Sequence, residues 1–331
     1  MIKVGEPRKP LRIVSTGRVP PIVLDILGRF GPVEVLTEPD EDGLVEAVRD
    51  AAALLVRGTA KVPARVIEAA SALRVIGRSG VGYDGVDIAA ATARGIPVVY
   101  TPGAGSRAVA EGALAVIFAL LKRLPSLDRE TRAGNWNARE AFAAGDIEGA
   151  VLGLVGLGRI GREVARLAAP FGMRILAHDP AVSRDEAASL GVKLAGLEQV
   201  LAESDAVSLH APLTESTRGM IDRQRLHQMK RGAILVNLAR GGLVENLDVL
   251  HEALLSGQLS ALGLDVFPAE PPDVRHPIFS HPNLLCTPHA LGLTARSTER
   301  IFTMVSNDIA AVLEGRRPEH VVNPEVFDVS L

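Results

Sequence analysis

Three side chains in the last third of the chain could do chemistry together. Two of them could form an acid–base pair, and the third is a cation that could bind an anion. Arg240 follows the apolar run 233–238, Glu270 follows the run 263–266, and His289 follows the run 284–286. A guanidinium binds a carboxylate through two parallel hydrogen bonds, which an ammonium cannot reproduce. A carboxylate beside an imidazole raises the pKa of that imidazole, so His289 next to Glu270 would donate a proton near pH 7. Each residue alone could equally be structural, but together they predict proton transfer to the carbonyl oxygen of a bound carboxylic acid.

A glycine motif in the middle of the chain predicts a dinucleotide site. The apolar run 151–155 leads into Gly156-x-Gly158-x-x-Gly161, and a helical pattern follows. The first glycine permits a tight turn, the second lets the backbone approach a pyrophosphate, and the third lets the helix pack on the strand. The N-terminus of that helix offers N–H groups and a partial positive charge to a diphosphate. The alternative is a glycine-rich turn that binds nothing.

A carboxylate at the end of the next strand favours the dinucleotide reading. Asp179 lies 18 positions after Gly161, close to the spacing of the acid that binds the adenosine ribose hydroxyls. A carboxylate there repels a 2′-phosphate, and Pro180 follows where a cation would serve NADP. The sequence therefore favours NAD, with NADP as the alternative because Arg184 is nearby.

Short apolar runs that alternate with helical patterns are expected to position these residues. This alternation is typical of α/β proteins with parallel sheets, whose ligands bind at the carboxyl ends of the strands. Helices are expected at 62–70, 86–94, 108–122 and 294–313. The expected strands are 11–15, 33–37, 52–56, 73–76 and 98–100, followed by 151–155, 174–177, 206–209, 233–238, 263–266 and 284–286. The last six make a complete dinucleotide-binding fold, and 331 residues are enough for two domains.

The composition narrows the classes of function. The chain is 47% hydrophobic and 23% charged with a net charge of −3, which fits a globular protein and excludes a broadly basic surface for nucleic acid. The longest apolar stretch, 113–121, is too short to span a bilayer. The N-terminus has no apolar signal segment, and one cysteine, Cys286, allows no intrachain disulfide. We expect a cytoplasmic protein that binds neither nucleic acid nor membrane, with Cys286 buried in a strand. The histidines, including His276 and His281, form no credible metal-ligand cluster, so no metal is expected.

The segments around Arg240, Glu270 and His289, in this order, resemble the D-isomer-specific 2-hydroxyacid dehydrogenase family. That family includes D-3-phosphoglycerate dehydrogenases, glyoxylate/hydroxypyruvate reductases and D-lactate dehydrogenases. The resemblance covers nearly the whole chain. Further matching segments are 78–87, 94–103, 109–111, 209–214 and 217–219.

The resemblance implies roles for residues beyond the Glu270–His289 pair and Arg240 at the substrate. It implies two Rossmann-like or flavodoxin-like α/β domains with parallel sheets and the active site in the cleft between them. The N-terminal loops would bind the substrate carboxylate through backbone N–H groups, with Arg57, Gly58, Gly80, Val81 and Gly82 as the implied residues. The implied NAD contacts are the three glycines, Arg159 and Ile160 at the diphosphate, Asp179 at the ribose, Pro212 and Thr217 alongside it, His210, Asp265 at the nicotinamide amide, and His289.

The resemblance also implies the division and assembly of the chain. Residues 1–104 and 294–331 would form a discontinuous substrate-binding domain, and residues 105–293 would form the NAD-binding domain. A homodimer is expected, because the apolar helix 108–122 exceeds what a small domain needs and relatives pair through this region. Trp136 matches a family position near the substrate or a subunit boundary.

The expected substrate is a small 2-keto acid or its D-2-hydroxy acid. Phosphohydroxypyruvate, glyoxylate and hydroxypyruvate all remain candidates. Cations that would suit a phosphate are Arg57, Lys61, Arg78 and Arg107. Two alternatives are an NAD(H)-sensing binding protein like the C-terminal-binding-protein corepressors, and a formate dehydrogenase. The latter branch usually carries glutamine where Glu270 stands.

Overall fold

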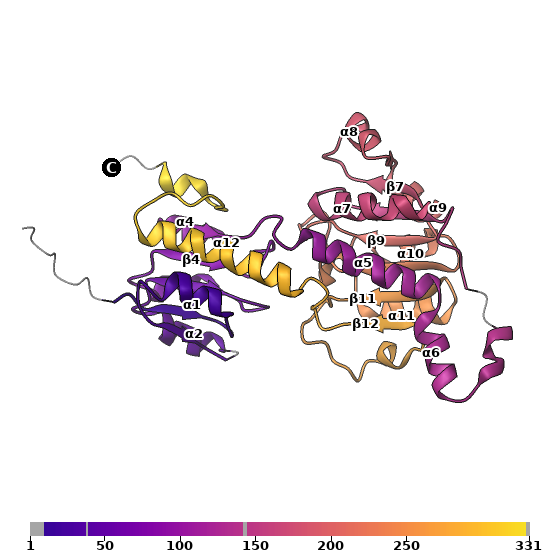
Figure 1. Cartoon of the computed structure of the whole chain (residues 1–331), viewed down its shortest axis with the longest axis horizontal. Coiled ribbons are helices and arrows are strands. Elements are labelled where there is room, and N and C mark those ends of the chain that lie inside the picture. The colour runs from indigo at the N-terminus through magenta and orange to yellow at the C-terminus, as the bar shows by residue number, and fades with distance from the viewer. Residues whose placement is uncertain (1–9, 38, 142–143, 329–331) are drawn as a thin grey trace, which may run out of the picture. The chain divides into compact units, whose positions relative to one another are not determined.

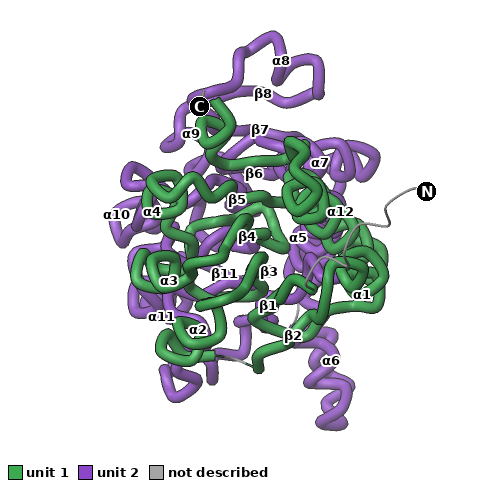
Figure 2. Tube along the Cα trace, turned by 90° about the vertical axis from the view of Figure 1, so that its left-hand side faces the viewer, with its two compact units in different colours: residues 1–105, 294–331 green, residues 106–293 purple. Residues whose placement is uncertain are grey.

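The computed structural model describes residues 10–37, 39–141 and 144–328. The chain divides into two compact units: residues 1–105 with 294–331, and residues 106–293 (Figure 2). The first boundary lies one residue from the expected one. Each unit is an α/β unit with one parallel sheet. None of the helices in the described ranges is long and apolar enough to cross a membrane.

Unit 1, drawn in Figure 1 in indigo and purple with its C-terminal segment in yellow, is built on a five-stranded parallel sheet in the order β2-β1-β3-β4-β5 (Figure 2). Its interior strands are apolar and buried on both faces, as parallel strands covered by helices must be. The strands are β1 (Ile13–Ser15), β2 (Val33–Val35), β3 (Ala53–Val56), β4 (Val75–Arg78) and β5 (Val98–Val99). The helices are α1 (Pro21–Leu27), α2 (Glu41–Val48), α3 (Ala64–Ala69), α4 (Ile88–Ala93), α12 (Ala295–Leu313) and the short 3-10 helix η5 (Pro324–Phe327).

The last long helix completes the core of unit 1. Helix α12 packs against α1 and β4, and its Phe302, Val305 and Ile309 are buried with apolar residues of β1, β3 and β4. A Cβ on Gly77 would lie 2.5 Å from Ile309 Cδ1, so glycine in β4 lets the helix lie directly on the sheet. One face of this sheet is therefore covered by a segment from the far end of the chain.

Unit 2 is built on a seven-stranded parallel sheet in the order β12-β11-β10-β9-β6-β7-β8. Its strands are β6 (Val151–Val155), β7 (Arg174–His178), β8 (Lys193–Leu194), β9 (Ala206–Leu209), β10 (Ala233–Asn237), β11 (Leu259–Leu264) and β12 (Leu284–Cys286). Its helices are α5 (Ser106–Leu121), α6 (Leu124–Arg132), α7 (Arg159–Ala168), α8 (Arg184–Ser189), α9 (Leu197–Glu203), α10 (Arg223–Gln228) and α11 (Leu247–Leu255). Short 3-10 helices are η1 (Trp136–Glu140), η2 (Ala169–Phe171), η3 (Gly241–Leu243) and η4 (Pro277–Ser280).

The structure corrects three details of the sequence-based expectation. Unit 2 has seven strands rather than six, because the two-residue strand β8 pairs with the edge of β7. Strand β11 spans Leu259–Leu264 rather than 263–266, since the chain leaves the sheet at Asp265. Cys286 lies in a strand as expected, but it is exposed rather than buried because β12 is the edge strand of the sheet.

Candidate active site

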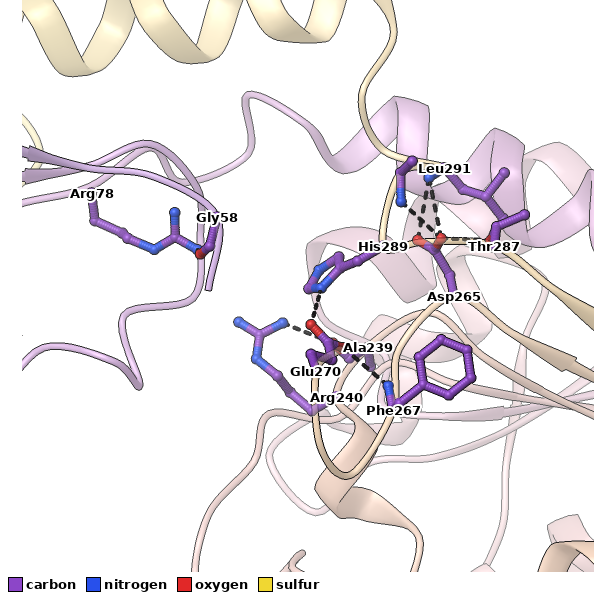
Figure 3. A network of polar contacts seen from close by, with 11 residues as sticks. Gly58, Arg78, Ala239, Arg240, Asp265, Phe267, Glu270, Thr287, His289 and Leu291 are labelled. Carbon is purple, nitrogen blue, oxygen red and sulfur yellow. Dashed lines mark hydrogen bonds and ion pairs between the residues drawn. The ribbon is translucent and has the colours of Figure 1, made fainter. Parts of the chain in front are cut away.

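The three candidate catalytic residues follow three neighbouring strands of unit 2. Strand β10 pairs with β11, and β11 pairs with β12, all in parallel. Parallel neighbours end at the same edge, so the loops after them lie side by side. Arg240, Glu270 and His289 come from these three loops, and Figure 3 shows their side chains gathered together. The sheet topology thus converts three distant sequence positions into one cluster.

Glu270 and His289 form a hydrogen-bonded ion pair. His289 Nδ1 lies 2.8 Å from Glu270 Oε2. A carboxylate only accepts, so Nδ1 carries the hydrogen and Nε2 is the ring atom left to exchange a proton with a ligand. The His289 side chain is 47% exposed and that of Glu270 is 19% exposed. The pair therefore has a shielded carboxylate and an accessible imidazole.

The surroundings of Glu270 keep it ionised. Burial raises the pKa of Glu270, but the hydrogen bonds from His289 and the Phe267 N–H, with the charges of His289 and Arg240, hold that pKa below its ordinary value. The Phe267 N–H donates to Glu270 Oε1 at 3.0 Å. Each carboxylate oxygen therefore has a donor of its own, which fixes the carboxylate against the imidazole.

The backbone of His289 lies in the left-handed region, with φ of 53°. A residue other than glycine rarely adopts this backbone conformation unless surrounding hydrogen bonds hold it there. The buried side chain of Asp265, only 3% exposed, supplies those bonds. Its Oδ1 accepts from Thr287 Oγ1 at 2.6 Å, before His289, and from the Ala290 N–H at 2.8 Å, after it. Its Oδ2 accepts from the Leu291 N–H at 3.2 Å. The turn that carries His289 is thus built around a buried carboxylate (Figure 3).

A buried amide holds the Arg240 turn in the same way. Asn237, fully buried at the end of β10, donates from Nδ2 to the Arg240 carbonyl oxygen at 2.9 Å and accepts from the Ala239 N–H at 3.0 Å. The guanidinium of Arg240 also donates to the Ala239 carbonyl oxygen at 2.7 Å. The turn is therefore bonded to the strand end from which it departs.

Gly241 brings the Arg240 loop against the Glu270 loop. A Cβ at this position would lie 1.9 Å from both the carbonyl carbon and the oxygen of Phe267, so only glycine allows the two backbones to approach this closely. Phe267 is also the residue whose N–H binds Glu270. The close approach of the Gly241 and Phe267 backbones thus brings the Arg240 loop next to the Glu270 loop.

The glycine motif forms the predicted strand–turn–helix. Gly156 follows β6 with φ of +101°, and Gly158 is the N-cap of α7 with no atom within 4 Å of an added Cβ. A Cβ on Gly161 would lie 2.2 Å from the Gly156 carbonyl oxygen, so the third glycine permits the helix to pack on the turn. The open face at Gly158 and the N-terminus of α7 together fit a bound pyrophosphate.

Asp179 lies beside this turn at the end of β7. Its Oδ2 accepts from the Leu157 N–H at 2.7 Å, and its Oδ1 accepts from the Ala181 N–H at 2.9 Å. The carboxylate is thus held next to the glycine turn, where a ribose attached to the diphosphate would lie. The donor set of turn, helix and carboxylate fits an NAD-type dinucleotide.

Comparison with known proteins identifies the family. Residues 114–290 match the family model described as D-isomer specific 2-hydroxyacid dehydrogenase, NAD binding domain. The chain is 40% identical to a glyoxylate reductase from Korarchaeum cryptofilum over 88% of each chain. The chain belongs to the D-isomer-specific 2-hydroxyacid dehydrogenases. Unit 2 is their NAD-binding domain.

The names of other relatives refer to several different substrates. The chain is 39% identical to D-3-phosphoglycerate dehydrogenase from Methanocaldococcus jannaschii over 95% of this chain but only 59% of that relative. The chain thus spans little more than half the length of the first curated relatives it matches. The TT0316 protein from Thermus thermophilus is 38% identical with a TM-score of 0.87, and the match covers 94% of this chain and 100% of that protein. D-Lactate dehydrogenase from Aquifex aeolicus, solved with NAD and lactic acid, is 28% identical with a TM-score of 0.86 over 94% and 99% of the two chains.

The remaining expected cofactor residues of this chain lie at the start of α7, in the loop after β9 and at the end of β11. Arg159 and Ile160 are the first residues of α7. The Thr217 hydroxyl donates to the Pro212 carbonyl oxygen at 2.6 Å and accepts from the Thr214 N–H at 2.8 Å, so it shapes the loop after β9. The carboxylate of Asp265 bonds the His289 turn, which is a structural role that the sequence analysis did not foresee.

His210 packs beneath the glycine turn as a neutral ring. Its Nε2 lies 2.9 Å from Ser208 Oγ, and its buried Nδ1 has no hydrogen-bond partner within the part of the chain that is described. Burial lowers the pKa of His210 to about 4. A Cβ on Gly156 would lie 2.6 Å from the His210 carbonyl carbon, so this residue and the glycine turn are packed backbone to backbone.

The expected substrate residues of unit 1 fall in two loops. Arg57 and Gly58 follow β3, while Gly80, Val81 and Gly82 follow β4. The Arg57 guanidinium lies 5.3 Å from the centroid of the Phe302 ring and donates to the Arg18 carbonyl oxygen. These two loops lie next to each other because β3 and β4 are paired.

Two residues that the sequence pattern did not single out hold the candidate catalytic ones. Asn237 and Thr287 contact the turns of Arg240 and His289 rather than standing in the cluster themselves. The sequence does contain a pattern that could have indicated Asn237 and Thr287. Each is a polar residue at the end of an apolar run, where a side chain can hydrogen-bond the backbone as the chain leaves the sheet. The pattern marks a turn, but it does not reveal which backbone groups the side chain bonds.

Proposed function

We propose that this chain is an NAD(H)-dependent oxidoreductase that interconverts a small 2-keto acid and its D-2-hydroxy acid. The observation that carries the proposal is the 2.8 Å Glu270–His289 pair next to Arg240, on the sheet edge that also carries the glycine turn. These groups match the needs of the reaction: an acid–base group, a carboxylate to hold its charge, and a cation for the substrate.

The proposed roles follow from the chemistry of each group. NAD(H), when held by the glycine turn and Asp179, would supply the hydride chemistry. His289 Nε2 donates a proton to the carbonyl oxygen during reduction and removes it from the hydroxyl during oxidation. Glu270 stabilises the imidazolium that is present before reduction and after oxidation. Arg240 binds and orients the carboxylate of the substrate.

A panel of keto acids tests the proposal. NADH oxidation is followed with glyoxylate, hydroxypyruvate, phosphohydroxypyruvate and pyruvate, because relatives of this chain carry the names of enzymes for several such acids. Turnover with at least one acid is expected. His289→Asn should lower the rate in both directions by about 10²–10⁴-fold, and Arg240→Lys should raise the KM for the acid.

NADH binding, measured by fluorescence, serves as the control for both variants. It should survive in each of them, since neither change touches the glycine turn. A wild-type protein that binds NADH but reduces none of the acids would reject the dehydrogenase proposal in favour of an NAD(H)-sensing protein.

We also propose a homodimer in the cytoplasm, on different grounds from those of the sequence analysis. Most apolar residues of α5 are buried within unit 2 against α7, β10 and β11, although Ala115 is exposed, so this helix alone offers little apolar surface for pairing. Exposed apolar side chains follow it instead: Leu124 is 55% and Trp136 is 68% exposed. Light scattering at micromolar concentration tests the dimer, and Trp136→Glu should shift it toward monomer. A single cysteine suits a reducing compartment.

A further inference from the structure

Two loops of unit 1 are joined by the side chain of a strand residue. Strands β3 and β4 pair in parallel with Val56 opposite Arg78, so the segments 57–60 and 79–83 leave the sheet at the same edge. Arg78 is the last residue of β4. Its side chain is therefore at the point where the two loops diverge.

The guanidinium of Arg78 bonds to carbonyl oxygens in both loops. Its Nε donates to Gly82 at 2.9 Å, its Nη1 to Ser79 at 3.2 Å, and its Nη2 to Gly58 at 2.9 Å. Figure 3 shows the guanidinium extended toward Gly58. A Cβ on Gly80 would lie only 3.4 Å from Nη1, so the second loop also rests on the guanidinium. One planar cation with donors in a fixed fork thus sets the spacing of both loops.

These bonds determine where the backbone N–H groups point. The C=O and N–H of a trans peptide point in opposite directions, so a peptide whose carbonyl faces Arg78 turns its N–H away from that cation. This applies to the peptides that follow Gly58 and Gly82. Neither the Thr59 N–H nor the Tyr83 N–H has a hydrogen-bond partner among residues 10–37, 39–141 and 144–328. Backbone N–H groups without a protein partner are available to an anion, and such groups form a concave anion site where they converge.

We propose that Arg78 is a positioning residue that holds these two loops in the conformation that binds the carboxylate of a small 2-keto acid. The inference rests on the proposed function for its ligand class. The charge of Arg78 suggests a cation that binds phosphate. In this proposal its guanidinium instead bonds carbonyl oxygens of the two loops and thereby orients their N–H groups. The specificity for a carboxylate then comes from the N–H groups rather than from the guanidinium.

A matched arginine in the same unit provides the control. Arg94 caps α4 and donates from Nη1 to the carbonyl oxygens of Ile67 and Ala70 at the end of α3. It is therefore another arginine that joins two backbone segments, but away from the glycine loops. Arg78→Lys and Arg94→Lys keep the charge and remove the fork in each case.

The experiment compares the two variants in the full-length chain. Arg78→Lys should raise the KM for the keto acid about tenfold or more with a smaller change in kcat, because uniform binding is lost. The Kd of NADH should stay within about twofold of wild type, since the glycine turn and Asp179 are unchanged. Arg94→Lys should keep the wild-type KM, even if its thermal unfolding temperature falls as far as that of Arg78→Lys. A wild-type KM in Arg78→Lys, or an equal rise in both variants, overturns the proposal.

A binding measurement separates this proposal from the proposed function. Calorimetric titration with oxamate, an unreactive analogue of a small 2-keto acid, is made in the presence of NADH. If the wild-type protein reduces no keto acid, the proposed function fails, and weaker oxamate binding in Arg78→Lys alone still supports the role of Arg78. Equal oxamate affinity in wild type and Arg78→Lys, or no oxamate binding by wild type, overturns that role.

Discussion

Asp265 and Thr287 are joined by a 2.6 Å hydrogen bond between the carboxylate Oδ1 and the hydroxyl Oγ1. The same oxygen accepts from the Ala290 N–H, so one buried atom bonds the chain on both sides of His289. This arrangement explains how a histidine is held at a φ of 53°. The imidazole is placed by its backbone as well as by Glu270.

Thr287→Val should therefore disturb His289, although the threonine hydroxyl bonds Asp265 and not the histidine. Valine keeps the shape but leaves one oxygen of Asp265 without its hydroxyl donor, which should cost about 1–2 kcal/mol of unfolding free energy. Misplacement of His289 should lower kcat by about tenfold. Thr287→Ser restores the hydroxyl and should recover the wild-type kcat. Steady-state kinetics of the two variants make the comparison, and equal kcat values in both would show that the bond does not position His289.

The two consecutive glycines after Arg240 should differ sharply in their tolerance of alanine. Gly241→Ala places a methyl group 1.9 Å from the Phe267 backbone, whereas Gly242→Ala places it 3.1 Å from the end of the flexible Leu213 side chain. The first change must separate the Arg240 and Glu270 loops, and we expect kcat/KM to fall by about 10²-fold. The second should stay close to wild type. Similar kinetics for both alanine variants would contradict the proposed loop contact.

Glu270→Gln should move the pH dependence of both directions of the reaction to lower pH. The carboxylate stabilises the protonated form of His289 across the 2.8 Å contact, and glutamine removes that charge. Reduction needs the protonated imidazole, so its basic limb should shift to lower pH. Oxidation needs the neutral imidazole, so its acidic limb should shift the same way. Rate profiles across the range from acid to alkaline pH measure both limbs, and unshifted limbs would reject the pairing.

Asp179→Ser should relax the choice of cofactor. Serine can no longer accept the ribose hydroxyls as a carboxylate does, so the Kd of NADH should rise by about tenfold or more. The negative charge that repels a 2′-phosphate is also lost, so NADPH should bind more tightly than to wild type. Fluorescence titration with both cofactors tests this. An unchanged preference for NADH would show that Asp179 is not the ribose ligand.

His210 should make the protein less stable in mild acid. Burial holds its folded-state pKa at about 4, below the value of about 6.5 for an unperturbed histidine. Unfolding therefore takes up a proton between these two pH values, so this contribution is fully present above about pH 6.5 and is lost as the pH falls toward about 4. It amounts to about 2 kcal/mol between about pH 7 and about pH 5. Urea unfolding at the two pH values should show a smaller loss for His210→Gln than for wild type; an equal loss would assign the effect to other groups.

The sequence predicted the interior strands of both units because each is a nearly continuous apolar run. Strands β6, β9 and β12 have the bounds expected for 151–155, 206–209 and 284–286. Strand β8 could not be predicted, because Lys193 and Leu194 join the sheet only by pairing with Leu176 and Ala177. The start of β11 was missed because Ser260 interrupts its apolar pattern.

The residues of the candidate site could be predicted from the sequence, but the hydrogen bonds that hold them in place could not. Arg240, Glu270 and His289 were expected from their residue types, their places after strands and the family resemblance. The bonds that place them involve backbone groups, such as the Arg240 carbonyl oxygen held by Asn237. Every residue has such groups, so no residue pattern reveals which ones will be used.

The position of α12 has a consequence for how the protein is made. The sheet of unit 1 is synthesised first, but the helix that covers one of its faces begins only at Ala295. At about 5–20 residues per second, the intervening stretch of unit 2 takes roughly 10–40 s to translate. During that interval the apolar side chains of β1, β3 and β4 on that face are covered in part by α1 but lack the contacts that α12 supplies. The first unit to leave the ribosome is therefore the last to complete its core, and its uncovered apolar surface favours aggregation until α12 emerges.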